Sequence, residues 1–159
     1  INIFNFAISK TNKKLNIYYP IIKIFFFRLP LFAYTYYVIN DLKKQINLDF
    51  IFKSGIVIEE KKLQLRKYKK SKIKYDLVKI DTNGYEHEIL ISIYSQLIKD
   101  KPVIILENSY MLPKINQLLS KLGYKKYFFE NDKIKSHKRE KSLNIIFLNK
   151  KILKQIKLY

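Results

Sequence analysis

Two carboxylates stand where short apolar runs end; the first is the leading candidate for acid–base chemistry, and the second is expected to line the same crevice. Asp81 follows the run Leu77–Ile80, and Glu107 follows the run Val103–Leu106. A carboxylate at the end of a strand can take the proton of a hydroxyl while the hydroxyl oxygen attacks an electrophile. Holding the reacting groups in line supplies a large part of such an acceleration. Asp81 also suits a turn or a helix N-cap, so a purely local role stays open.

The residues around Asp81 predict a strand, a tight turn and a helix. The apolar run before Asp81 is typical of a strand buried in a parallel sheet. Asn83 and Gly84 suit the turn, because both tolerate a positive φ better than most residues. After Tyr85 the apolar residues recur on one helical face, at Ile89, Leu90, Ile93 and Leu97. Ligands of open α/β sheets bind at the carboxyl ends of the strands, so this turn is the predicted site.

The same stretch resembles a known family. It reads Leu77-Val78-Lys79-Ile80-Asp81-Thr82-Asn83-Gly84-Tyr85-Glu86, and it is followed by Pro102-Val103-Ile104-Ile105-Leu106-Glu107. Both segments are similar to the FkbM family of S-adenosylmethionine-dependent methyltransferases, and the later Leu122-Gly123-Tyr124 fits the family as well. The resemblance covers the second half of the chain well and the first half weakly. One departure is Asn83, which stands where the family most often has Glu.

The resemblance implies direct, metal-independent O-methylation of a hydroxyl on a sugar, a glycan or a secondary metabolite, with S-adenosylmethionine as the donor. The residues that it assigns to the site are Asp81, Asn83 and Glu86 as catalytic, Asp81 and Gly84 as contacts of the donor, and Glu107, Asn108 and Tyr85 as contacts of the acceptor. Asn83 cannot act as a base at neutral pH. If the family's Glu transfers a proton, this chain lacks that step; if the Glu only orients a hydroxyl, Asn83 can replace it.

The second half of the chain predicts alternating strands and helices. The expected elements are a helix over 85–99, a strand over 103–106, a helix that starts near Pro113 and ends at Gly123, a strand over 124–129, a charged loop over 130–141 and a strand over 143–148. This order predicts an α/β fold, and the resemblance implies a partial Rossmann-like sheet of the class I methyltransferase type with an antiparallel last strand. Residues 1–150 would form the partial methyltransferase domain, and 151–159 a basic tail.

The first half predicts strands of the same sheet. One is expected to end near Ser9, as the third strand of the Rossmann-like sheet, and another to cover 15–19. The first two strands would then lie upstream, so we expect a fragment whose beginning is missing. With three glycines in all, the chain has no glycine-rich donor loop. We therefore expect it to bind S-adenosylmethionine weakly or not at all by itself.

Residues 20–50 are rich in aromatic side chains and form an expected insertion or lid. Lys23, Arg28 and Pro30 argue against a membrane span. Peripheral contact with a membrane, with the aromatic rings at the depth of the headgroups, stays open. Beyond this region, 55–58 is a strand candidate and the basic stretch 61–74 a candidate for a short helix.

The net charge is +19, with lysine spread over nearly every segment. Such charge suits nucleic acid or anionic lipid, but Ile, Lys, Asn, Tyr and Phe dominate the composition, as in A/T-rich genomes. We therefore interpret the charge as a solvated surface and do not expect nucleic-acid binding. The sequence lacks cysteine, which suits the cytoplasm, and the placing of its two histidines does not suggest a zinc site. A non-catalytic relative and a basic binding module remain the alternatives.

Overall fold

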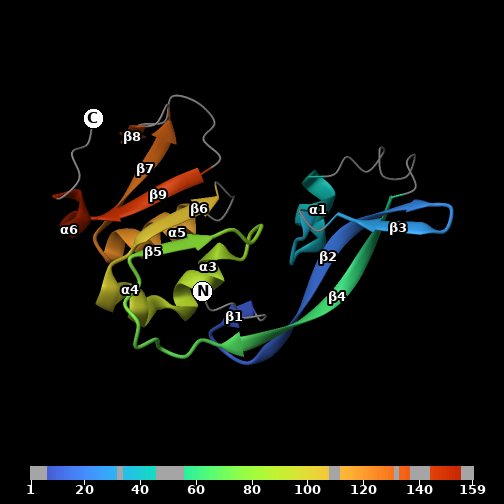
Figure 1. The fold of residues 1–159 in the computed structure, drawn as a ribbon, viewed down its shortest axis with the longest axis horizontal. Helices are drawn as coiled ribbons and strands as arrows, with labels where there is room; N and C mark the ends of the chain where they lie inside the picture. Colours follow the sequence, from blue (N-terminus) through green and yellow to red (C-terminus); the bar gives the residue numbers. More distant parts are fainter. Residues whose placement is uncertain are drawn as a thin grey trace. The chain divides into compact units, whose positions relative to one another are not determined.

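The computed structural model describes residues 7–31, 34–45, 56–107, 112–130, 133–136 and 144–154 (Figure 1). It is an α/β structure with two mixed sheets, one of four strands and one of five. The chain divides into two compact units. Unit 1 comprises Ile1–Lys67 and Thr82–Tyr85, and unit 2 comprises Tyr68–Asp81 and Glu86–Tyr159. Each sheet belongs to one unit.

The five-stranded sheet of unit 2 has the order β5-β6-β9-β7-β8. Its strands are β5 (Leu77–Ile80), β6 (Val103–Glu107), β7 (Tyr124–Glu130), β8 (Lys133–Lys135) and β9 (Asn144–Asn149). β5 and β6 run parallel, whereas β9 runs antiparallel to both of its neighbours, β6 and β7. The expected antiparallel last strand is thus confirmed.

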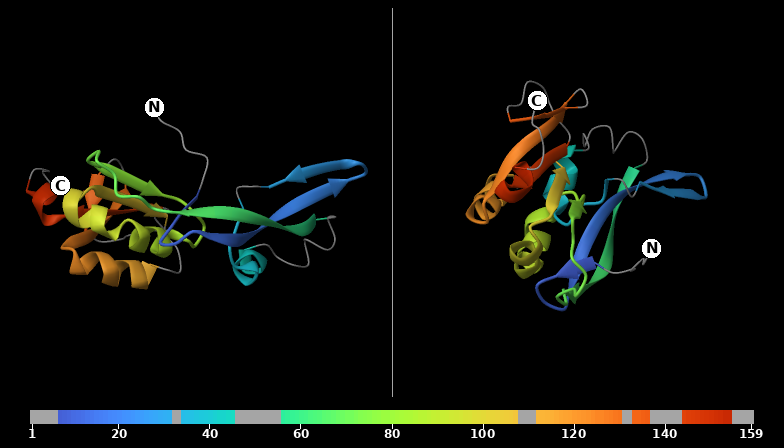
Figure 2. Two further views of the ribbon diagram at one scale, coloured as in Figure 1. Left: turned by 90° about the horizontal axis from the view of Figure 1, so that it is seen from below. Right: turned by 60° about the vertical axis from the view of Figure 1, so that its left-hand side comes forward.

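Three helices cover one face of this sheet (Figure 2): α3 (Glu86–Ser92), α4 (Tyr94–Asp100) and α5 (Leu112–Lys121). Alternate strand residues point to this face and are buried, among them Ile80, Ile104, Leu106, Ile145 and Phe147. On the opposite face Tyr127, Ile146 and Leu148 form a second apolar cluster, with Ile152 and Leu153 of α6 (Lys150–Leu153) packed against it.

The four-stranded sheet of unit 1 has the order β1-β4-β2-β3. Two long strands dominate it, β2 (Lys13–Ile24) and β4 (Ile56–Lys67), which pair antiparallel over ten residues. β1 (Ala7–Ser9) pairs parallel with β4, and β3 (Phe27–Pro30) forms a hairpin with β2. The short helix α1 (Ile39–Gln45) contacts β2, and its Leu42 is fully buried.

The structure corrects several expectations for the first half. β1 and β2 belong to a sheet of their own, so the strand that ends at Ser9 is not a neighbour of β5. The strand predicted over 15–19 runs on to Ile24, through the region expected to be a lid. The basic stretch after Glu60 continues β4 as far as Lys67 and forms no helix there. Leu63 and Leu65 instead point to the same side of an extended strand, with a period of two.

Three further expectations change in unit 2. The apolar run of β5 is not buried from both sides, because β5 is an edge strand with Leu77 58% exposed. The helix expected over 85–99 is broken at Ile93 into α3 and α4. There Ser92 Oγ donates to the carbonyl of Glu88 (2.7 Å), a bond that bends helices. The charged loop over 130–141 contains β8, which pairs with β7.

Among the residues described, none forms a helix of the length and hydropathy needed to cross a bilayer.

Candidate functional site

The two carboxylates expected at strand ends do lie at adjacent strand ends. Ile80 of β5 is in register with Leu106 of β6; Asp81 directly follows Ile80, and Glu107 is the last residue of β6. Glu107 alternates with the buried Leu106 and therefore points to the sheet face that α3, α4 and α5 do not cover, as Lys79 does. Lys79 Nζ lies 3.5 Å from Asp81 Oδ2, and both side chains are exposed. Lys79 therefore has a local ion-pairing role beside Asp81.

Asn144 joins this edge from the third strand. β9 runs antiparallel to β6, so its first residue meets the last residue of β6, and Asn144 is the register partner of Glu107. An amide can both donate and accept hydrogen bonds beside the carboxylates. Sequence reasoning missed Asn144, because the signal is the pairing of β9 with β6 and not a local motif.

Burial and neighbouring charges shift the pKa of Glu107. Partial burial raises the pKa of its carboxyl, and the nearby negative charges of Asp81 and Glu86 raise it further, while Lys79 opposes them. Glu86 is fully buried in the first turn of α3. Asp81, Glu86 and Glu107 all belong to unit 2, and the first two are near enough for their charges to act on Glu107. An acid with a raised pKa beside a paired carboxylate is a common feature of catalytic sites, although ion-pair networks produce it too.

The other site residues predicted from the motif belong to the turn. Asn83 and Gly84 both have positive φ, 49° and 105°, so the expected tight turn is confirmed. Together with Tyr85 they belong to unit 1. Asn108, predicted to contact the acceptor, lies outside the described residues.

Tyr85 is packed as a core residue of unit 1. Its ring is buried and meets the ring of Tyr37 edge-on, with centroids 5.1 Å apart. Lys13 Nζ lies 5.9 Å from the centroid of the Tyr85 ring. Among the described residues the Tyr85 hydroxyl has no hydrogen-bond partner. These contacts account for Tyr85 by packing and leave its predicted role at the acceptor untested.

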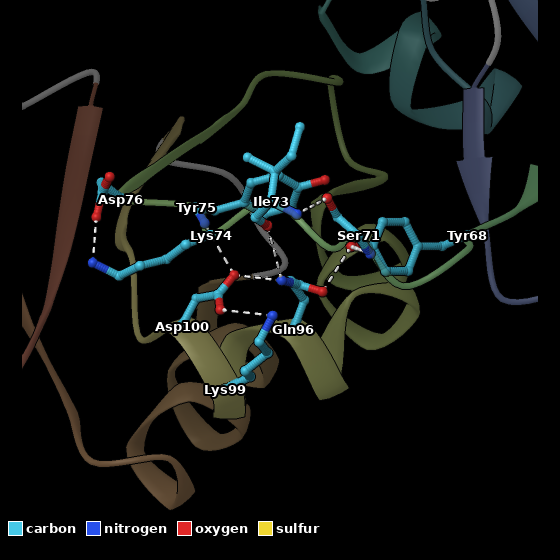
Figure 3. Close-up of polar contacts among 9 residues, drawn as sticks. All are labelled: Tyr68, Ser71, Ile73, Lys74, Tyr75, Asp76, Gln96, Lys99 and Asp100. Atoms are coloured by element: carbon cyan, nitrogen blue, oxygen red, sulfur yellow. Dashed lines mark hydrogen bonds and ion pairs between the residues drawn. The ribbon is translucent and has the colours of Figure 1, made fainter.

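A second polar cluster of unit 2 went unnoticed in the sequence (Figure 3). Gln96 of α4 is 1% exposed and lies between Tyr68 and Asp100. Its Oε1 accepts a bond from the Tyr68 hydroxyl (3.2 Å), and its Nε2 donates to Asp100 and to the carbonyl of Ile73 (3.4 Å). The main-chain N–H of Ser71 donates to the Tyr68 hydroxyl (3.2 Å). These bonds hold the segment between β4 and β5 against α4, a structural role.

Burial and hydrogen bonding shift the titration of this cluster. Burial, together with Tyr75, raises the pKa of Tyr68 to about 12. The hydrogen bond from the N–H of Tyr75, helped by Gln96, lowers the pKa of Asp100. Both shifts favour the protonation states already present at neutral pH, a neutral phenol and an ionised carboxylate, so the cluster does not titrate there.

Among the described residues, no group of three or more His, Cys, Asp or Glu side chains is arranged to hold a metal ion. No protein-family model matches the chain, and no curated protein or solved structure is significantly similar to it.

Proposed function

We propose that the edge formed by Asp81, Glu107 and Asn144 is the acceptor side of a methyltransferase site of the FkbM type. The observation that carries the proposal is the placement of Asp81 and Glu107 at the ends of two neighbouring parallel strands, with the pKa of Glu107 raised. The motif around Asp81 and the antiparallel last strand of the sheet support the family. The reaction would be O-methylation of a hydroxyl on a sugar, a glycan or a secondary metabolite.

In this proposal Glu107 is the base. A raised pKa makes its carboxylate a stronger acceptor for the hydroxyl proton as the oxygen attacks the methyl group. Asp81, anchored by Lys79, would accept a hydrogen bond from a neighbouring hydroxyl and fix the sugar's orientation. Asn144 would supply an amide donor at the same edge. The positive φ of Asn83 favours a role in the turn, so the carboxylate that the family most often has there is not required for this mechanism.

The donor, S-adenosylmethionine, is not accommodated by these residues alone. Asp81 and Gly84 are the predicted contacts, and the sequence has no glycine-rich loop to cradle the cofactor. When bound, the donor would supply an electrophilic methyl group. At this edge Glu107 would take the proton of the acceptor, and Asp81 and Asn144 would orient it.

The test is methyl transfer from labelled S-adenosylmethionine, at high donor concentration, to a panel of sugar and small-molecule hydroxyls. If the wild type transfers, Glu107→Gln should lose roughly a hundredfold or more of the rate, the usual contribution of a positioned base. Glu88→Gln is the matched control. It makes the same change at a residue of α3 that has no part in the proposed mechanism and whose Oε1 lies 3.7 Å from His87 Nδ1. Unchanged transfer by Glu107→Gln would contradict the role of Glu107.

A second readout does not depend on the donor. The carboxyl resonance of Glu107 should shift in NMR spectra when an acceptor binds, and the pKa that it reports should change. If no acceptor in the panel moves this resonance and none is methylated, the proposal fails and the non-catalytic alternative takes its place.

A further inference from the structure

The turn between β2 and β3 exposes three consecutive phenylalanines. Phe25 is 96% exposed, Phe26 99% and Phe27 79%. Leu29, two residues beyond Phe27 and on the same side of β3, is exposed as well. Isolated exposed apolar residues are ordinary, but a contiguous patch of large ones marks an interaction site.

The backbone of this turn does not explain the choice of residues. Phe25 has a φ of 51°, a region that hairpin turns normally fill with Gly, Asn or Asp. Phe25 thus combines an unfavourable conformation with almost complete exposure of its ring, and Phe26 beside it is equally exposed. Strained and exposed positions of this kind point to function.

The charge next to the turn is positive. Lys23 and Arg28 are register partners across the hairpin, and Lys23 is exposed. Arg28 pairs with Glu59, so Lys23 is the cation nearest the turn without an ion pair among the described residues. Elsewhere in the described part of unit 1, the acidic side chains Asp41, Glu59 and Glu60 are outnumbered by Lys and Arg.

We propose that the Phe25–Phe27 turn inserts into the interfacial layer of a lipid bilayer with anionic headgroups. Large apolar side chains next to lysine or arginine are the composition of segments that lie in this layer. Insertion is limited to this depth, because the main-chain groups of a turn need water or other partners that the hydrocarbon core lacks. The cations along β2 and β4 add a longer-range attraction, which salt screens.

The chain contains no tryptophan, so Phe26→Trp gives a single fluorescent reporter at the turn. With vesicles of phosphatidylcholine and phosphatidylglycerol, its emission should shift to the blue and be quenched by lipids brominated on the acyl chain. Ile98→Trp, on the exposed surface of α4 in unit 2, is the matched control and should show neither change. Vesicles of phosphatidylcholine alone and high salt should both weaken the response.

Sedimentation with the same vesicles tests the wild-type residues. Replacing Phe25, Phe26 and Phe27 by serine should weaken partitioning roughly tenfold or more. Replacing three exposed apolar residues of unit 2 by serine should leave the partitioning unchanged; these are Ile73, Leu77 and Ile98. Because all six side chains are exposed, circular dichroism should show that both variants remain folded.

Equal partitioning of the turn variant and the wild type, or no partitioning of the wild type, would overturn the proposal. A blue shift of Phe26→Trp that appears without lipid and grows with protein concentration would also overturn it. That result would show that a second copy of the chain covers the turn. Each outcome is independent of methyl transfer.

Discussion

The main-chain N–H of Tyr75 donates a hydrogen bond to Asp100 Oδ2 at 3.0 Å. Tyr75 lies in the segment that leads into β5, and Asp100 is the last residue of α4. Only 2% of the Asp100 side chain is exposed, and Gln96 donates to the same carboxylate oxygen. The bond therefore ties the start of β5, and with it the strand that carries Asp81, to the helix beneath the sheet.

Asp100 should make the free energy of unfolding depend on pH in the acidic range. Its pKa is lowered by the bond from Tyr75, so its contribution to folding is complete above the ordinary aspartate pKa of about 3.9. The contribution is lost as the pH falls through the lower value of the folded state. Urea unfolding between neutral pH and pH ~3 should show a steeper loss of stability for the wild type than for Asp100→Asn. Identical acid profiles for the two proteins would rule out this role of Asp100.

Removing the hydroxyls of three tyrosines should change the unfolding free energy by different amounts. Tyr68→Phe deletes the bond to Gln96 and leaves the N–H of Ser71 without its acceptor, which should cost about 1–3 kcal/mol of unfolding free energy. The buried hydroxyls of Tyr85 and Tyr124 have no partner among the described residues. Tyr85→Phe and Tyr124→Phe should therefore be neutral or stabilising. Denaturant unfolding of the three variants measures the difference, and a loss at Tyr85 or Tyr124 as large as that at Tyr68 would contradict it.

The elements of the second half were predictable because their signals are local. A run of apolar residues between polar ones predicted β6 and β9, and Gly123 predicted the end of α5. The turn after β5 was predictable from Asn83 and Gly84, since few other residues adopt positive φ readily. These signals lie within a few residues of the element that they define.

The structure of the first half was harder to predict, because it depends on pairing between residues that are distant in the sequence. β2 and β4 stabilise each other over ten register pairs, although Pro20 lies inside β2 and charged residues are frequent in β4. Local signals indicated only part of each strand, 15–19 and 55–58, and the pairing between the two extends both beyond those signals. The same holds for the site: Asp81 and Glu107 could be placed at strand ends, but Asn144 meets Glu107 only through the pairing of β9 with β6.

Gly123 offers a test of the turn that ends α5. Its φ is 79°, while a Cβ added there would lie 3.6 Å from Asn149 Nδ2, an ordinary contact. The cost of Gly123→Ala is therefore conformational, about 1–2 kcal/mol of unfolding free energy. Gly123→Asn should lose less, because Asn tolerates this region better. If denaturant unfolding gives an equal loss for both variants, the cost comes from contacts of the new side chain and not from the backbone.

The pKa of Glu107 should follow the charges around it. Asp81→Asn removes a neighbouring negative charge and should lower this pKa, whereas Lys79→Met removes the opposing cation and should raise it. A titration of the Glu107 carboxyl followed by NMR measures both shifts. Glu88→Gln serves as the control, since Glu88 is not among the charges that act on Glu107.

The raised pKa of Glu107 also affects the stability of the folded protein. Because the folded pKa of Glu107 lies above the unfolded value, its contribution is favourable below the unfolded pKa and is lost as the pH rises through the folded one. At neutral pH the ionised carboxylate therefore opposes folding. Glu107→Gln should be slightly more stable than the wild type there, and the gain should disappear in acid. A functional site often retains such a destabilising group. A Glu107→Gln protein less stable than the wild type at neutral pH would instead show that the carboxylate is held by favourable bonds, and that its raised pKa is not the mark of a catalytic base.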